Sequence, residues 1–260
     1  MRLLCGDGPA LLVGHRGAAA TAPENTLRAF DAALVAGVDA IEFDVLDLPG
    51  GPLVLAHSDD LHEVSHGTAT GLVRGSTLDE LRAVAPELPT LDEALDWFEA
   101  HADVLLHVDL KLTTRLDELV DAIRTRGLAE RTVVSSFHVP SLEAVASTGA
   151  PIAIGRTYPE DRYGVAQRPA LRPVLRAGTL ALRRALAVRV PAMIERAGAT
   201  ALMLHHAVVS QAAVAKAHGR GAAVWAWTVD DPAEAARVLA AGVDAVITND
   251  PAGLAATLRP

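Results

Sequence analysis

The sequence predicts a (β/α)8 TIM barrel, an α/β fold in which eight parallel strands form a closed inner sheet. Short apolar or β-branched runs alternate along the chain with stretches of helical periodicity, which is typical of a parallel sheet. Eight such strand–helix units in 260 residues match the usual size of this barrel. No linker rich in Ser, Pro or Gly divides the chain, so we expect one domain spanning residues 1–260.

The expected elements alternate in chain order. The predicted strands lie at residues 11–14, 39–45, 52–57, 104–110, 132–136, 151–155, 200–204, 222–228 and 243–247. The predicted helices lie at residues 24–36, 91–101, 115–126, 140–148, 209–218 and 232–241. Thr90 and the pair Asp231-Pro232 are typical helix starts, and we interpret residues 23–26 (PENT) as a further start. Four helices are expected to end at glycine, namely Gly37, Gly127, Gly219 and Gly242.

One predicted strand, residues 52–57, exceeds the count of eight. About seven residues, including Pro49, separate it from the preceding strand, whereas a parallel crossover needs a dozen or more. We therefore predict an antiparallel hairpin within an insertion that spans residues 46–89. Folding the chain back about Pro49-Gly50 places His57 level with Glu42.

Composition excludes several classes of protein. The net charge of −9 argues against nucleic-acid binding, which requires a basic surface. Cys5 stands alone, so no intramolecular disulfide forms, which suits a reducing compartment. No apolar run approaches the roughly 18 residues of a membrane span, and the N-terminus lacks the layout of a signal peptide. We expect a cytoplasmic protein without stable membrane insertion, and the oligomeric state stays open.

Polar side chains concentrate at the carboxyl ends of the predicted strands, where function lies in this fold. Glu42 and Asp44 are two residues apart in one strand and share a face, as do Asp109 and Lys111 in another. Three carboxylates aimed at one spot repel one another unless a cation neutralises them. Because oxygen ligands favour a hard ion over zinc, these residues predict a site for Mg²⁺ or Ca²⁺.

The order of the motifs resembles one enzyme family. The segments GHRG (14–17), APENTLRAF (22–30) and IEFDV (41–45) are followed by a histidine after an apolar strand, and then by VDLK, SSF, WTVDD and GVDAVITNDP. Along most of the chain this pattern resembles the glycerophosphodiester phosphodiesterase family. The resemblance implies a metal-dependent barrel enzyme that hydrolyses small glycerophosphodiesters to an alcohol and sn-glycerol 3-phosphate.

The resemblance also implies the role of each site residue. It matches His15 and His57 to the catalytic pair, Glu42, Asp44 and Asp109 to the metal ligands, and Arg16 and Lys111 to phosphate contacts. The chemistry agrees, because a cation and two basic side chains offset the negative charge that protects a phosphodiester from attack. Two histidines supply a proton donor and a proton acceptor near neutral pH, and which is which stays open.

Other residues have two interpretations. Phe137 and Trp227 either line the substrate pocket or pack in the core, whereas His107, His205 and His206 are expected either to support the site residues from behind or to be structural. In the family an aspartate follows the second histidine, whereas this chain has His57-Ser58-Asp59. Either Asp59 orients His57 or the loop is remodelled. The family has Glu where this chain has Asp109, a shorter side chain that shifts the ion by about 1 Å, admits a water or alters the metal preference.

Residues 162–190 carry seven arginines and no acid. The segment is either a solvated helix face or a basic patch that steers anionic substrates and makes weak contact with lipid headgroups. Two alternative functions also stay open. One is phospholipase-D-like hydrolysis of lysophospholipids on the same barrel, and the other is an inactive relative that binds phosphodiesters. Headgroup preference and the choice between Mg²⁺ and Ca²⁺ are left undecided by the sequence.

Overall fold

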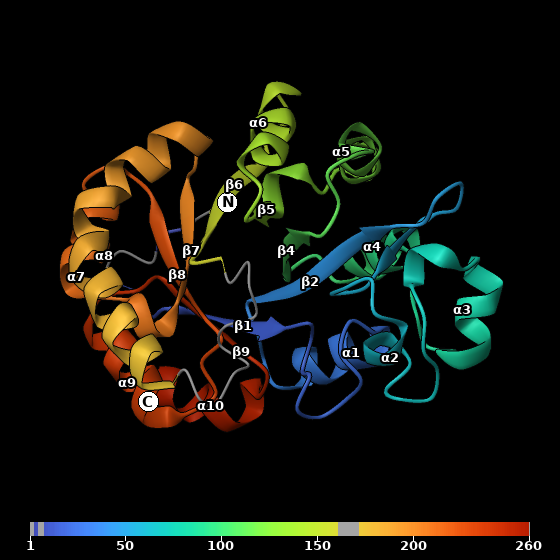
Figure 1. Ribbon diagram of the computed structural model, residues 1–260, viewed down its shortest axis with the longest axis horizontal. Coiled ribbons are helices and arrows are strands. Elements are labelled where there is room, and N and C mark those ends of the chain that lie inside the picture. The colour runs from blue at the N-terminus through green and yellow to red at the C-terminus, as the bar shows by residue number, and fades with distance from the viewer. Residues whose placement is uncertain (1–2, 5–7, 161–171, 260) are drawn as a thin grey trace.

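Eight parallel strands close a barrel that helices surround (Figure 1). The structure is a computed structural model that describes residues 3–4, 8–160 and 172–259. The barrel strands are β1 (Leu11–His15), β2 (Ala40–Asp47), β4 (Leu105–Leu110), β5 (Thr132–Ser136), β6 (Ala153–Tyr158), β7 (Ala201–His205), β8 (Ala223–Trp227) and β9 (Ala245–Thr248). β1 pairs with both β2 and β9, which closes the sheet and confirms the predicted fold.

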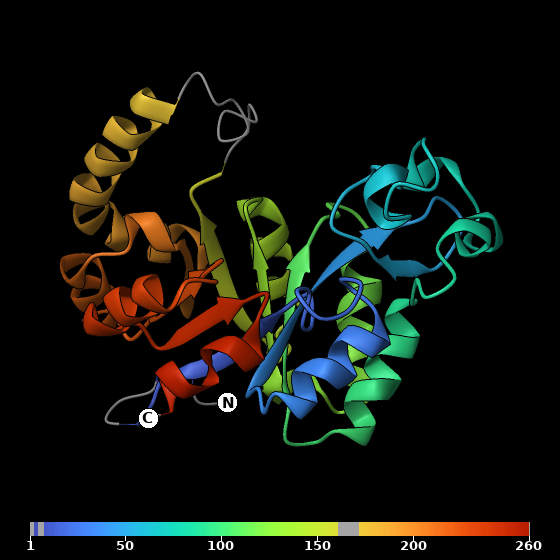
Figure 2. The same cartoon turned by 90° about the horizontal axis from the view of Figure 1, so that it is seen from below.

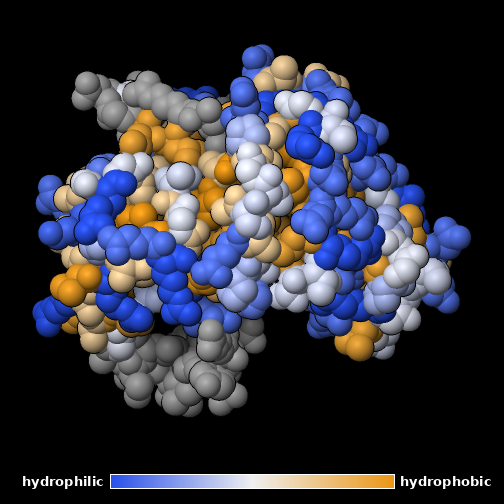
Figure 3. Space-filling view, turned by 90° about the horizontal axis from the view of Figure 1, so that it is seen from above, coloured by the Kyte–Doolittle hydropathy of each residue, from blue (hydrophilic) through white to orange (hydrophobic). Residues whose placement is uncertain are grey.

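Helices follow most strands and cover the outside of the barrel. They are α1 (Leu27–Val35), α2 (Leu61–Val64), α3 (Leu78–Val84), α4 (Leu91–Ala100), α5 (Leu116–Thr125), α6 (Val139–Ser147), α7 (Arg172–Ala197), α8 (Gln211–His218), α9 (Pro232–Ala240) and α10 (Pro251–Leu258). The helices predicted by residue range correspond to α1, α4, α5, α6, α8 and α9. In Figure 3, hydrophilic residues occupy most of the coloured edge of the visible face, as expected for the solvent side of such helices.

Alternation along the strands produces two apolar cores. Side chains such as Leu12 and Phe43 point outward and pack against the helices. Side chains of opposite parity, such as Val13, Met203 and Trp225, fill the barrel interior. The interior becomes polar toward the carboxyl ends of the strands, so the apolar layer forms the floor beneath the polar groups described below.

Local sequence explains where helices begin and end. Thr90 accepts a hydrogen bond from the backbone N–H of Glu93 and forms a capping box at the start of α4, as predicted. Gly37, Gly127 and Gly242 adopt positive φ angles just after their helices, the conformation that glycine permits without strain. Gly219 differs, because it ends α8 with φ −63° and leaves the left-handed conformation to the later Gly221.

An insertion follows β2 and contains β3 (Leu53–Leu55), which pairs with β2 in antiparallel fashion as predicted. Its register is one residue away from our prediction, because Val45 pairs with Leu55 and the backbone N–H of Ala56 donates to the carbonyl of Asp44. The insertion has its own apolar cluster, which includes Leu48, Val73 and Leu81. In Figure 2 it rises on the side of the barrel toward which the strands point.

The basic segment predicted at 162–190 is only partly described. Residues 162–171 lie outside the described residues, and 172–190 belong to α7, a helix of 26 residues with Pro191 inside it. Arg189 donates to the Tyr158 hydroxyl at 3.2 Å, and Leu180 and Val188 are exposed. No helix within the described ranges combines the length and the apolar character that a membrane crossing requires.

Candidate active site

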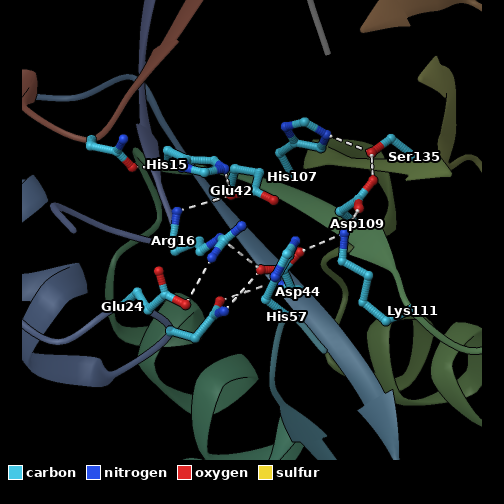
Figure 4. Close-up of polar contacts among 12 residues, drawn as sticks. His15, Arg16, Glu24, Glu42, Asp44, His57, His107, Asp109, Lys111 and Ser135 are labelled. Carbon is cyan, nitrogen blue, oxygen red and sulfur yellow. Dashed lines mark hydrogen bonds and ion pairs between the residues drawn. The ribbon is translucent and has the colours of Figure 1, made fainter. Parts of the chain in front are cut away.

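Strand register arranges the polar side chains in two rows across neighbouring strands. In the first row His15 of β1 pairs with Glu42 of β2, which pairs with His107 of β4. One step closer to the strand ends, Asp44 pairs with Asp109, which pairs with Ser135 of β5. Parallel strands with this register direct all six side chains to the barrel interior, as Figure 4 shows.

Three carboxylates meet where these rows cross β2 and β4. Glu42, Asp44 and Asp109 are buried, and one oxygen of each lies within 4.8 Å of the others. Burial and the charges of the other two carboxylates raise the pKa of Glu42 well above its usual range. The all-oxygen donor set of these three carboxylates fits a hard divalent cation.

Two basic side chains lie against the same carboxylates. The ammonium of Lys111 contacts Asp44 Oδ1 at 3.0 Å and Asp109 Oδ2 at 2.5 Å. The guanidinium of Arg16 lies 3.1 Å from Asp44 Oδ2 and donates to Glu24 Oε1 at 2.7 Å. Although burial alone would raise it, the charges of Lys111 and Arg16 hold the pKa of Asp44 below its usual range. Both cations thus remain close to carboxylates that face the cavity.

The PENT segment starts α1 through Thr26, whereas its Glu24 and Asn25 support the polar side chains of the site. Thr26 caps α1, whereas the Asn25 side chain donates to Asp44 Oδ2 at 2.9 Å and accepts from the backbone N–H of Asp44 at 3.0 Å. Glu24 binds Arg16. Our interpretation of Glu24 and Asn25 as helix-start residues was therefore wrong, because their side chains turn to the barrel mouth.

The turn after β1 requires glycine at two positions. A Cβ at Gly14 would collide with the carbonyl oxygen of Gly17, and a Cβ at Gly17 would lie 2.6 Å from the backbone of Ala29. Gly17 also has φ +85°. This close approach allows the backbone N–H of Arg16 to donate to Glu42 Oε2 at 2.9 Å.

His15 is held by an amide. Its Nδ1–H donates to Asn249 Oδ1 at 2.6 Å, and Asn249 Nδ2 in turn donates to Asp230 at 2.8 Å, which fixes the orientation of the amide. Nε2 of His15 is left on the side of Glu42, 3.9 Å from Oε2. Burial, followed by the nearby charge of Arg16, lowers the pKa of His15 to about 4.

His57 is held by a carboxylate that we did not predict. Its Nδ1–H donates to Glu63 Oε1 at 2.7 Å, and the Ser58 hydroxyl donates to the other oxygen of Glu63. Asp59 accepts instead from the backbone N–H of Arg74 at 2.7 Å. The loop is thus remodelled, and Asp59 is not the partner of His57. The signal for Glu63 was weak, because it lies on a four-residue helix.

A buried hydrogen-bond chain supports the third carboxylate. The Ser135 hydroxyl donates to Asp109 Oδ1 at 2.5 Å, so the Nε2–H of His107 donates to Ser135 at 2.9 Å. Nδ1 of His107 has no hydrogen-bond partner among the described residues. Burial lowers the pKa of His107 to about 4, so the ring is neutral. Ser135 was a strand-end polar residue that the parity argument could have identified.

An aromatic wall lines the same cavity as the carboxylates. Phe137 and Trp227 meet edge to face with ring centroids 6.0 Å apart, and His205 packs against Trp227 at 5.2 Å. The indole N–H of Trp227 donates to the carbonyl of Met203 at 3.0 Å, which fixes the ring. His205, which we expected to support the site from behind or to be structural, lines the cavity itself.

All of the predicted site residues line one cavity of about 720 Å³ at the mouth of the barrel. They are His15, Arg16, Glu42, Asp44, His57, Asp109, Lys111, Phe137 and Trp227. The arrangement combines a cation site, two fixed cationic side chains and two histidines, which together suit the cleavage of an anionic phosphodiester.

Comparison with known proteins agrees with this geometry. Residues 15–253 match the model of the glycerophosphoryl diester phosphodiesterase family. A glycerophosphodiester phosphodiesterase from Caldanaerobacter subterraneus subsp. tengcongensis is 27% identical, over 96% of this chain and 98% of its own. A crystal structure from Silicibacter pomeroyi, assigned the same activity, has a TM-score of 0.77 and 25% identity, over 98% of this chain and 95% of its own. A phosphodiesterase from Oleispira antarctica, in complex with the product sn-glycerol-3-phosphate, has a TM-score of 0.74 and 22% identity, over 97% of this chain and 98% of its own.

Proposed function

The chain belongs to the glycerophosphoryl diester phosphodiesterase family, and from this premise we propose that it is a metal-dependent enzyme releasing sn-glycerol 3-phosphate from glycerophosphodiesters. The observation that carries the proposal is the cluster of Glu42, Asp44 and Asp109 between two histidines. The chain is a hydrolase of phosphodiesters, as the family and the curated relatives are. The product is proposed by analogy with the complex of the Oleispira antarctica protein.

We assign the cation to the three buried carboxylates. Their oxygens lie close enough to share one ion, and burial, followed by the charges of Asp44 and Asp109, raises the pKa of Glu42. The ion is Mg²⁺ or Ca²⁺, because both prefer carboxylate oxygens. When bound, it supplies positive charge that stabilises the phosphodiester and its transition state. Arg16 and Lys111 add fixed positive charge beside it and bind the phosphate oxygens.

Proton transfer is assigned to the two histidines. Each has its Nδ1–H engaged, by Asn249 and by Glu63, so each presents Nε2 for reaction. The negatively charged Glu63 lies 2.7 Å from Nδ1 of His57, which favours His57 as the acid that protonates the leaving alcohol. The neutral amide of Asn249 suits an uncharged His15, which favours His15 as the base.

The aromatic wall contributes to substrate binding. Phe137 and Trp227 present apolar ring surface to the cavity that the carboxylates also line. Carbon atoms of the substrate pack there while the phosphate lies at the polar side. Leu182 of α7 and Val208 extend this apolar surface, which is the observation that keeps lysophospholipids as a second class of substrate.

A panel of substrates tests the proposal. Purified protein is assayed with glycerophosphocholine, glycerophosphoethanolamine and lysophosphatidylcholine, each with Mg²⁺, with Ca²⁺ and with a chelator. We expect ion-dependent release of sn-glycerol 3-phosphate from the first two substrates. Release of choline and lysophosphatidic acid from the third alone would favour the phospholipase-D-like alternative, and tight binding without turnover of any of them would favour the inactive relative.

Further proposals concern the whole chain. Residues 1–260 form one domain, with residues 46–89 as an insertion that has its own apolar cluster. The protein works in the cytoplasm on small molecules and binds no nucleic acid, in keeping with its net charge of −9. Residues 162–190 make at most weak contact with lipid headgroups, supported by their seven arginines.

A further inference from the structure

The second histidine of the site is not held by the barrel. His57 follows β3 in the insertion, and its side chain is 36% exposed. A side chain this exposed keeps rotamer freedom unless a specific contact removes it. The described contact that fixes its ring is the bond from Nδ1–H to Glu63 Oε1 at 2.7 Å, in which only one ring nitrogen is engaged.

Glu63 is itself held in place by Ser58 and by the short helix that carries it. The Ser58 hydroxyl donates to the oxygen that His57 does not use. Asp60 caps α2, the short helix that carries Glu63, by accepting from the backbone N–H of His62 at 2.9 Å. The hydrogen bond from His57, followed by that from Ser58, lowers the pKa of Glu63 to about 2, so the carboxylate is ionised at neutral pH. A fixed, charged acceptor thus lies beside His57.

We propose that Glu63 is the positioning residue of His57, holding the proton on Nδ1 so that Nε2 faces the substrate cavity. The proposal rests on the proposed function, because it assigns Glu63 a role in the proton transfer by His57. An ionised carboxylate accepts only from the protonated nitrogen of imidazole, so it selects one of the two neutral tautomers. The same contact restricts the rotation of the ring.

Glu63 has an alternative role, in which it positions Arg16, the residue assigned to bind the phosphate. Glu63 Oε1 also lies 3.5 Å from a terminal nitrogen of Arg16. That guanidinium has a nearer partner in Glu24 at 2.7 Å and lies close to Asp44. Removing Glu63 therefore leaves Arg16 with two carboxylates, whereas it leaves Nδ1 of His57 with none of the contacts described. The two roles differ in which kinetic constant they change.

Kinetics of matched variants separate these roles. Glu63→Ala removes the carboxylate, Glu63→Gln keeps an acceptor without the charge, and Glu87→Ala removes an exposed carboxylate of the insertion that pairs with Arg28. We expect Glu63→Ala to lower kcat by about 10- to 100-fold while KM changes by less than about threefold. Glu63→Gln should recover part of kcat, and Glu87→Ala should match the wild type. A change confined to KM would overturn the proposal in favour of a role through Arg16.

A double variant tests whether Glu63 acts through His57. In a His57→Ala background the positioning role predicts no further loss of kcat on adding Glu63→Ala, because the positioned group is already absent. A further loss of about 10-fold would show that Glu63 acts elsewhere and would overturn the proposal. Melting temperatures of all variants are recorded beside the rates, and a role confined to folding would lower them together with kcat.

The tautomer of His57 can be measured without turnover. Nitrogen-15 NMR of ring-labelled protein distinguishes a protonated Nδ1 from a protonated Nε2, with His57→Ala identifying the signal. We expect the Nδ1–H form in wild-type protein and in Glu87→Ala, and a mixture with the Nε2–H form in Glu63→Ala. An unchanged tautomer in Glu63→Ala would overturn the proposal. Because this measurement needs no substrate, it stands even if the enzyme hydrolyses no glycerophosphodiester.

Discussion

Replacing Glu42 by Gln removes one negative charge from the carboxylate cluster and keeps the side-chain volume. Glu42 is 4% exposed, and its Oε2 accepts from the backbone N–H of Arg16. A glutamine can keep that acceptor. We therefore expect the fold to be retained, so that any effect reports the charge rather than the shape of the site.

The distances set the size of the effect. Two charges within 4.8 Å repel by about 3.5 kcal/mol at an effective dielectric constant near 20, and Glu42 has two such neighbours. The positive charges of Arg16 and Lys111 offset most of this repulsion. We expect Glu42→Gln to stabilise the ion-free protein by about 1–2 kcal/mol, which corresponds to a rise in melting temperature of roughly 2–8 °C.

Adding a divalent ion should reverse the order of the two proteins. An ion at 100 times its dissociation constant stabilises the wild type by about 2.7 kcal/mol, whereas a variant that binds no ion gains nothing. Thermal unfolding is therefore measured for both proteins in chelator and in saturating Mg²⁺ or Ca²⁺. Wild type should be the less stable protein in chelator and the more stable one with the ion.

The advantage of the variant in chelator should also depend on pH. The folded state raises the pKa of Glu42 above its ordinary value of 4.5. Below that value Glu42 is protonated in both states, and the two proteins should melt alike. As pH rises, the unfolded chain ionises Glu42 more easily than the folded protein does, so the wild type loses stability relative to the variant. Equal melting of the two proteins at all pH values, or an equal gain on adding the ion, would refute the reasoning.

Three further perturbations test the site and the turn beside it. His15→Ala and His57→Ala should each lower kcat by about 10²–10⁴, and the double variant should lose little beyond the worse single one; a near-normal kcat in either would remove that histidine from the chemistry. Ser135→Ala deletes a donor to the third carboxylate and should weaken divalent-ion binding by about 10-fold in calorimetry, whereas unchanged affinity would show that this donor is dispensable. Gly17→Ala should cost more than about 2 kcal/mol in denaturant unfolding, because the new Cβ would lie 2.6 Å from the backbone of α1. Gly127→Ala is its control, since that glycine also has positive φ but a Cβ there would meet no atom within 4 Å, and an equal cost for both would contradict the steric argument.

The parity of strand residues explains why most of the site was predictable. Residues two apart on a strand share a face, so Glu42 and Asp44 had to point together, and Asp109 and Lys111 likewise. Parallel strands then bring their carboxyl ends to one mouth. The barrel itself followed from alternation and chain length, and the structure confirms it.

The site contacts that we did not predict come from short segments without helix or strand periodicity. Glu63 reaches His57 from a four-residue helix in the insertion, and Asn249 reaches His15 from the turn after β9. The hairpin register was wrong by one residue because the chain between Asp47 and Leu53 folds back about Gly50 itself rather than between Pro49 and Gly50. Loop contacts of this kind depend on side-chain reach in three dimensions, which spacing along the chain does not report.

The most direct test of metal-dependent hydrolysis joins ion binding to turnover. A divalent ion is titrated into chelator-stripped protein while calorimetry follows binding and a coupled assay follows release of sn-glycerol 3-phosphate from glycerophosphocholine. We predict that both curves saturate together at one ion per chain, and that Glu42→Gln abolishes both. Turnover that persists without the ion, or that survives in Glu42→Gln, would contradict the assignment of the metal to this cluster.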